Sequence, residues 1–132
     1  MVIDASVLVA ILLDEPEREA FQRVIDASAA RLVSAVTKLE ASVVMMARRG
    51  SAAADELDRL LAAIAAIVVP FDNHQADVAR RAFERYGKGR HRAALNLGDC
   101  AAYALAIAEA EPLLFKGTDF SATDVERVEL GR

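Results

Sequence analysis

The chain has 132 residues, a formal net charge of −4 at pH 7, 55% hydrophobic residues and a single cysteine, Cys100. This length suits one domain over residues 1–132, and the apolar content excludes an intrinsically disordered chain. The longest apolar run, residues 60–70, is shorter than the roughly 20 residues that cross a membrane. One cysteine excludes an intramolecular disulfide, and the start of the chain does not resemble a secretory segment. We therefore expect a cytoplasmic protein without membrane contact.

Charge is unevenly distributed along the chain. Residues 80–92 contain six basic residues and one acid, whereas the remainder contains 10 basic and 19 acidic residues. This basic cluster is compatible with a solvated charged face and with a contact to a polyanion.

The predicted elements alternate between short apolar strands and helices. In chain order we expect a strand at 1–3, helices at 7–13 and from Pro16 to about 28, a strand at 31–33, helices at 34–49 and 52–66, a strand at 67–69, a helix at 72–86, a polar loop at 87–95, a helix at 97–110, a strand at 113–115 and a fifth, edge strand at 125–130. Gly50 and Gly87 are placed to end the helices before them. Strands separated by helices predict a three-layer α/β/α domain with a mostly parallel central sheet.

Four acidic residues fall near the carboxyl ends of the predicted strands, where α/β sheets bind ligands. They are Asp4, Glu40, Asp99 and Asp119. Each also has a structural explanation, because Asp4 and Asp119 can cap helical turns, while Thr37 with Glu40, and Asn96 with Asp99, have the spacing of capping boxes. Together, four carboxylates at one sheet edge would repel one another unless a cation lay between them.

The chemistry of such an acidic cluster favours Mg²⁺ or Mn²⁺ over zinc, because it offers carboxylate oxygens without thiolates. A divalent ion held there can activate water and stabilise the leaving oxygen of a phosphodiester. The residues therefore predict a metal-dependent phosphodiesterase but do not identify its substrate. A metal-free mechanism through His74 and His91 is only weakly supported, since they lie 17 positions apart.

Four segments resemble the successive motifs of the PIN-domain family, and closely those of its VapC-type toxins. They are residues 1–12 (MVIDASVLVAIL), 34–40 (SAVTKLE), 95–106 (LNLGDCAAYALA) and 113–120 (LLFKGTDF). The resemblance implies catalytic and metal-binding roles for Asp4, Glu40, Asp99 and Asp119. It also implies supporting roles for Ser6 and Thr118, while Asn96 either caps its helix or supports Asp99. Ala5 stands where many relatives have threonine.

This resemblance implies a PIN-like fold and a Mg²⁺-dependent endoribonuclease that acts as the toxin of a toxin–antitoxin pair. Its implied partners are RNA, a cognate antitoxin covering the acidic pocket, and a second copy of the chain. We expect the homodimer interface to draw partly on the apolar stripe of Leu57, Leu60, Leu61 and Ile64.

RNA contacts are predicted at Arg85, Lys88, Arg90 and Arg92, which lead into the Asp99 motif, and at Lys116. Two alternatives stay open. One is a catalytically silent PIN-like binding protein. The other is a Mg²⁺-binding receiver module, which would need adjacent acids after the first strand, where Asp4 stands alone.

Overall fold

A four-stranded sheet forms the centre of the computed structural model, which describes residues 1–131. Its strands are β1 (Val2–Ile3), β2 (Leu32–Ser34), β3 (Ile67–Val69) and β4 (Leu113–Leu114). They lie in the order β3-β2-β1-β4, and every neighbouring pair is parallel. The carboxyl ends of all four strands therefore share one edge of the sheet.

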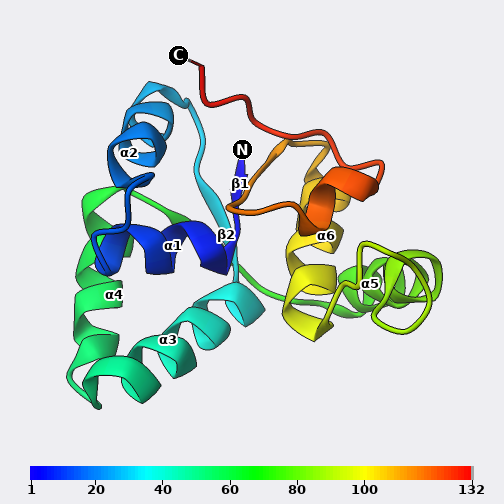
Figure 1. Ribbon diagram of the computed structural model, residues 1–132, viewed down its shortest axis with the longest axis horizontal. Coiled ribbons are helices and arrows are strands. Elements are labelled where there is room, and N and C mark those ends of the chain that lie inside the picture. Colours follow the sequence, from blue (N-terminus) through cyan, green and yellow to red (C-terminus); the bar gives the residue numbers. More distant parts are fainter. Residues whose placement is uncertain (132) are drawn as a thin grey trace.

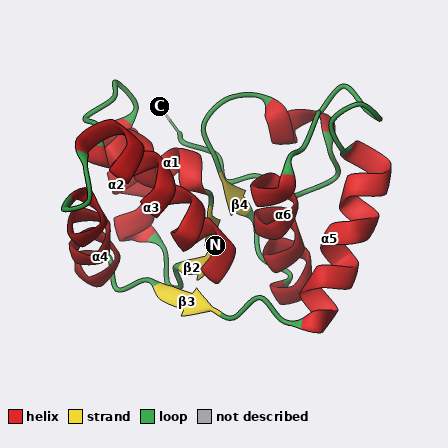
Figure 2. Cartoon of the chain, turned by 90° about the horizontal axis from the view of Figure 1, so that it is seen from below, coloured by secondary structure: helices red, strands yellow, loops and turns green. Residues whose placement is uncertain are grey.

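Helices cover both faces of the sheet, which confirms the predicted α/β/α fold. They are α1 (Ala5–Leu12), α2 (Arg18–Ala27), α3 (Ala35–Arg49), α4 (Ala53–Ala63), α5 (Asn73–Tyr86) and α6 (Leu97–Glu109), followed by the short 3-10 helix η1 (Asp119–Ala122). Helices α1 to α4 lie on one side of the strands, and α5 and α6 lie on the other (Figures 1 and 2). No helix within residues 1–131 has the length and apolar character needed to cross a membrane.

The two cores are built from alternate residues of the same short strands. Val2 and Leu113 pack with the residues of α5 and α6, whereas Ile3 and Leu114 pack with those of α1 to α4. All four side chains are buried. Because successive strand residues point to opposite faces, strands covered on both sides appear in the sequence as uninterrupted apolar runs.

One predicted strand is absent and several predicted boundaries differ, most of them by one or two residues; α4 ends at Ala63, three residues earlier than expected. The fifth strand is wrong: residues 125–130 make a single bridge, in which Leu113 donates to the carbonyl of Glu126 and accepts from Val128 at 2.8 and 3.0 Å. With only two residues in β4, the pairing cannot extend further. The first helix begins at Ala5, directly after its cap, and α2 begins at Arg18 because Glu15 to Glu17 form a turn.

Candidate active site

Asp4 follows β1 directly and caps α1. Its Oδ2 accepts hydrogen bonds from the Ser6 amide at 3.1 Å and the Ser6 hydroxyl at 2.5 Å. The side chain is buried, and its Oδ1 has no hydrogen-bond partner. Burial raises the pKa of Asp4, although the bonds from Ser6 oppose this change. Asp4 is therefore both a cap and a buried carboxylate with one unpartnered oxygen.

All four predicted acids line one pocket of about 530 Å³. Asp4, Glu40, Asp99 and Asp119 come from the segments that follow β1, β2 and β4 and from the start of α6. The predicted supporting residues Ser6 and Asn96 also line this acidic pocket, but Thr118 does not. Thr118 is exposed and makes no side-chain capping bond to η1.

Glu40 takes no part in capping α3, so the predicted capping box with Thr37 is wrong. The helix is capped by Ser34, whose Oγ accepts from the amide of Val36 at 3.2 Å. Thr37 is buried and its hydroxyl has no partner within the described chain. Burial, together with repulsion from Asp4 and Asp99, raises the pKa of Glu40 to about 7.

Asp99 lies in the first turn of α6 and forms a capping box with Asn96. The backbone N–H of Asn96 donates to Asp99 Oδ2 at 3.0 Å, and the backbone N–H of Asp99 donates to the side-chain Oδ1 of Asn96 at 2.9 Å. Burial raises the pKa of Asp99 to about 6, against the opposing effect of that bond and with repulsion from Asp4 and Asp119. Asp99 therefore both caps α6 and lines the acidic pocket.

The donor set of the pocket fits a hard divalent cation. Within residues 1–131, no three His, Cys, Asp or Glu side chains are gathered as a ready metal site. However, Asp4 Oδ1 lacks a partner, and repulsion between carboxylates contributes to the raised pKa of Asp4, Glu40 and Asp99. A divalent ion relieves repulsion between carboxylates, and a site with oxygen donors alone suits Mg²⁺ or Mn²⁺.

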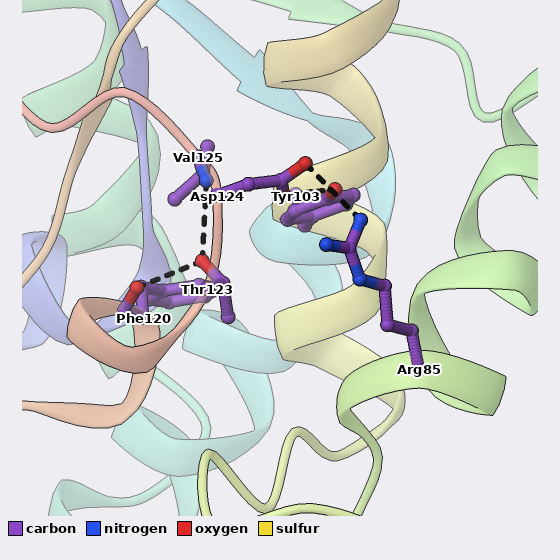
Figure 3. Close-up of polar contacts among 6 residues, drawn as sticks. All are labelled: Arg85, Tyr103, Phe120, Thr123, Asp124 and Val125. Atoms are coloured by element: carbon purple, nitrogen blue, oxygen red, sulfur yellow. Dashed lines mark hydrogen bonds and ion pairs between the residues drawn. The ribbon is translucent and has the colours of Figure 1, made fainter.

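Two of the basic residues predicted to contact RNA are held in ion pairs. Arg85 lies 3.4 Å from the Asp124 carboxylate, which also accepts a 2.6 Å hydrogen bond from Tyr103 (Figure 3). The bond from Tyr103 is the main cause of a lowered pKa at Asp124. Arg85 thus ties α5 to the segment after η1 and does not line the acidic pocket.

Lys116 lies at the acidic pocket, where its ammonium contacts Glu15 and lies 3.2 Å from Glu17. Its amide donates to the Ser6 hydroxyl at 3.0 Å. Glu15 and Glu17 were not predicted as site residues, because in the sequence they stand only as two acids in a turn. Lys116 and Glu15 both line the acidic pocket, and because their opposite charges are paired they add no net charge to it.

The remaining basic candidates lie in the loop between α5 and α6. Lys88, Arg90 and Arg92 are exposed and form no ion pair within residues 1–131. The Lys88 amide donates to Leu95 and the Leu95 amide donates to Tyr86, at 2.9 and 3.0 Å, which closes the loop. These residues do not line the acidic pocket, although their loop leads to α6, the helix that carries Asp99.

The fold and site together define a parallel α/β domain with a carboxylate pocket at the carboxyl edge of its sheet. The sequence profile of one family, described as PIN domain, matches residues 1–126. The chain belongs to the PIN domain family.

Named relatives cover almost the whole chain. It is 49% identical over 130 residues to Ribonuclease VapC30 of Mycobacterium tuberculosis, spanning 98% of this chain and 99% of that protein. The crystal structure of Mycobacterium tuberculosis VapC20, a Sarcin-Ricin loop cleaving toxin, has a TM-score of 0.79 at 16% identity and covers 97% of this chain and 98% of its own. A toxin–antitoxin complex from Klebsiella pneumoniae has a TM-score of 0.70 at 17% identity, covering 98% and 97%.

Proposed function

We propose that the chain is a divalent-metal-dependent endoribonuclease that acts as the toxin of a toxin–antitoxin pair. The observation that carries this proposal is the single pocket lined by Asp4, Glu40, Asp99 and Asp119. The 49% identity to Ribonuclease VapC30 supports RNA as the substrate class. We expect Mg²⁺ or Mn²⁺ as the ion.

In the proposed mechanism these four carboxylates would hold the ion. When bound, it supplies the acidity that activates water and the charge that stabilises the leaving oxygen of the phosphodiester. Ser6 fixes Asp4 Oδ2, which leaves Oδ1 available, and the Asn96 amide fixes Asp99 Oδ2 in the same way. Because the pKa of Glu40 is raised to about 7 without the ion, its carboxylate would release a proton when it binds the ion near neutral pH.

The direct test uses the purified chain with a mixture of RNAs and with single-stranded DNA of matched sequence. We expect RNA cleavage in Mg²⁺ or Mn²⁺, none in EDTA, and recovery when the ion is restored. Preferential cleavage of DNA, or RNA cleavage that persists in EDTA, would contradict the proposal.

We further propose that RNA reaches the acidic pocket across the loop of Lys88, Arg90 and Arg92. An acidic pocket repels phosphates, and this loop offers exposed cations beside the helix that carries Asp99. Changing all three residues to Ala should weaken RNA binding and lower the slope of log affinity against log salt by about 2, because each lost phosphate contact contributes about 0.7 for single strands.

Binding is measured in Ca²⁺, so that affinity is recorded without turnover. The matched control changes Arg23, Arg48 and Arg59 to Ala, which removes the same charge from exposed positions on α2, α3 and α4. An unchanged affinity and salt slope in the loop variant would place the RNA path on another face.

The apolar stripe expected at the homodimer interface lies largely in the core of the single chain. Leu57 and Leu61 are buried in the core, and Leu60 and Ile64 pack against it. Large apolar side chains are instead exposed on α3 and on the neighbouring ends of α5 and α6. They are Leu39, Val43 and Met46 on α3, Phe83 on α5 and Leu97 on α6, with Leu97 84% exposed. We propose that this α3–α6 face pairs with a second copy of the chain.

Replacing Leu39 and Leu97 with Lys should convert the dimer into a monomer, because each lysine places a charge within an apolar contact. Light scattering at micromolar concentration measures the mass. The control, Ile107→Lys, alters an exposed apolar residue at the far end of α6. A monomeric unmodified chain, or a dimer that survives the double substitution, would exclude this interface.

We also propose an antitoxin that covers the acidic pocket. The toxin–antitoxin complex from Klebsiella pneumoniae shares the fold of this chain and supports such a partner. A protein encoded beside the toxin should bind the chain and suppress RNA cleavage in proportion to the amount of complex. Full cleavage by the isolated complex would exclude inhibition by this route.

A further inference from the structure

Gly98 lies beside Glu40 in a way that leaves no room for a side chain. A Cβ placed on Gly98 would lie 1.9 Å from Glu40 Oε2, 2.5 Å from Cδ and 2.8 Å from Oε1. The two residues belong to different helices, α6 and α3. Van der Waals repulsion forbids all three distances, so the Glu40 carboxylate occupies space that only a glycine leaves open.

Backbone conformation does not explain the glycine at position 98. Gly50, Gly89, Gly117 and Gly131 have positive φ angles and nothing within 4 Å of an added Cβ, whereas Gly98 has ordinary helical backbone. Glycine within a helix is less stable than alanine by roughly 0.5–1 kcal/mol. The contact that accounts for Gly98 is therefore the one with Glu40.

The Glu40 carboxylate also has no other anchor. It makes no hydrogen bond or ion pair with another side chain in residues 1–131. Glu40 lines both the acidic pocket and a neighbouring apolar groove that includes Leu39, Val43 and Leu97. Its position between them therefore depends on the shape of the surface at Gly98.

We infer that Gly98 is a positioning residue that lets the Glu40 carboxylate lie at the acidic pocket, where it contributes to binding a divalent cation. The inference rests on the proposed metal-dependent function. An added methyl group meets the end of a flexible side chain, so the fold can persist while the carboxylate moves away.

The test is a Mn²⁺ titration, followed by electron paramagnetic resonance, of four chains: the unmodified chain, Gly98→Ala, Glu40→Asp and the double variant. We expect Gly98→Ala to weaken Mn²⁺ binding about 10–100-fold, the range found when groups that orient metal ligands are changed. The apo melting temperature should be unchanged or higher, because alanine favours the helix. The shorter side chain of Glu40→Asp avoids the added methyl group. When Glu40→Asp is already present, adding Gly98→Ala should therefore weaken Mn²⁺ binding by less than about twofold.

Equal Mn²⁺ affinity of Gly98→Ala and the unmodified chain would overturn the inference. So would an equal loss in both backgrounds, because Gly98 would then act through the helix and not through Glu40. Absence of Mn²⁺ binding to the unmodified chain would instead contradict the proposed function. In that case a crystal structure of apo Gly98→Ala decides the inference, which requires a displaced Glu40 carboxylate and fails if α6 shifts while Glu40 stays in place.

Discussion

Asp99→Asn is expected to reduce RNA cleavage by at least about 100-fold while the chain stays folded, because it removes a charge that holds the ion but keeps the side-chain shape. Asn at position 99 can still accept the Asn96 amide bond that closes the α6 cap. Asp4→Asn should behave alike, since Asp4 is buried with one unpartnered oxygen. Initial rates of RNA cleavage measure the loss.

Both substitutions should also raise the melting temperature of the metal-free chain at pH 7.5, because each removes the charge of a buried (Asp4) or half-buried (Asp99) carboxylate whose pKa is raised. Asp55→Asn is the matched control, since Asp55 is exposed on α4 outside the acidic pocket. Cleavage at the unmodified rate by purified Asp99→Asn would exclude a role for this carboxylate.

Without metal, the chain should lose stability as the pH rises from about 5 to 8. In the folded chain the pKa is raised from 4.5 to about 7 at Glu40 and from 3.8 to about 6 at Asp99, and it is raised at Asp4 as well. A raised folded pKa means that folding favours the protonated acid, so the penalty is absent below the unfolded pKa and complete above the folded one. A penalty on the order of 1 kcal/mol lowers the melting temperature by about 4 °C in a domain of this size.

The opposite trend should appear in acid. Glu17 and Asp124 have lowered pKa values, so their contribution to stability is lost as the pH falls below about 4. Saturating Mg²⁺ should raise the melting temperature most at pH 8, because metal binding requires deprotonated carboxylates. Thermal melts from about pH 2 to 8, with and without Mg²⁺, measure both effects. In the variant Glu40→Gln with Asp99→Asn the alkaline decline should flatten, and an unchanged decline would assign it to other groups.

The sheet was predictable because its strands are short apolar runs, at residues 1–3, 67–69 and 113–115. Strands β1 and β4 are buried on both faces, whereas β3 lies at the edge of the sheet, where Ile67 is 59% exposed. Residues 125–130 mix apolar and charged side chains, and Val125, Val128 and Leu130 do contact the core. Burial alone does not create a strand, however, and the short β4 leaves a single bridge.

The acidic pocket was predictable because parallel strands bring their carboxyl ends to one edge, so position along the chain determined which acids meet. Side-chain contacts between distant segments were not predictable in this way. Lys116 and Glu15 are 101 residues apart, and Arg85 and Asp124 are 39 apart. Local periodicity carries no information on which charges long side chains will reach.

Gly98 was missed for the same reason. In the sequence Gly98 directly precedes Asp99 near the start of a predicted helix, and nothing in the neighbouring residues indicates why a glycine is needed there. Its constraint comes from Glu40, which approaches from α3. The contact becomes visible only when the two helices are placed side by side.

The chemistry of the cleaved ends distinguishes metal-dependent hydrolysis of RNA from a metal-free reaction. Water activated at a metal site should leave 5′-phosphate and 3′-hydroxyl ends, and these products should disappear in EDTA and with Asp99→Asn. Attack by the RNA's own 2′-hydroxyl would leave 2′,3′-cyclic phosphate and 5′-hydroxyl ends without a metal. Mass spectrometry of a short RNA cut by the purified chain separates the two outcomes. We expect the 5′-phosphate product, and cyclic phosphate formed in EDTA would rule out the metal-dependent mechanism.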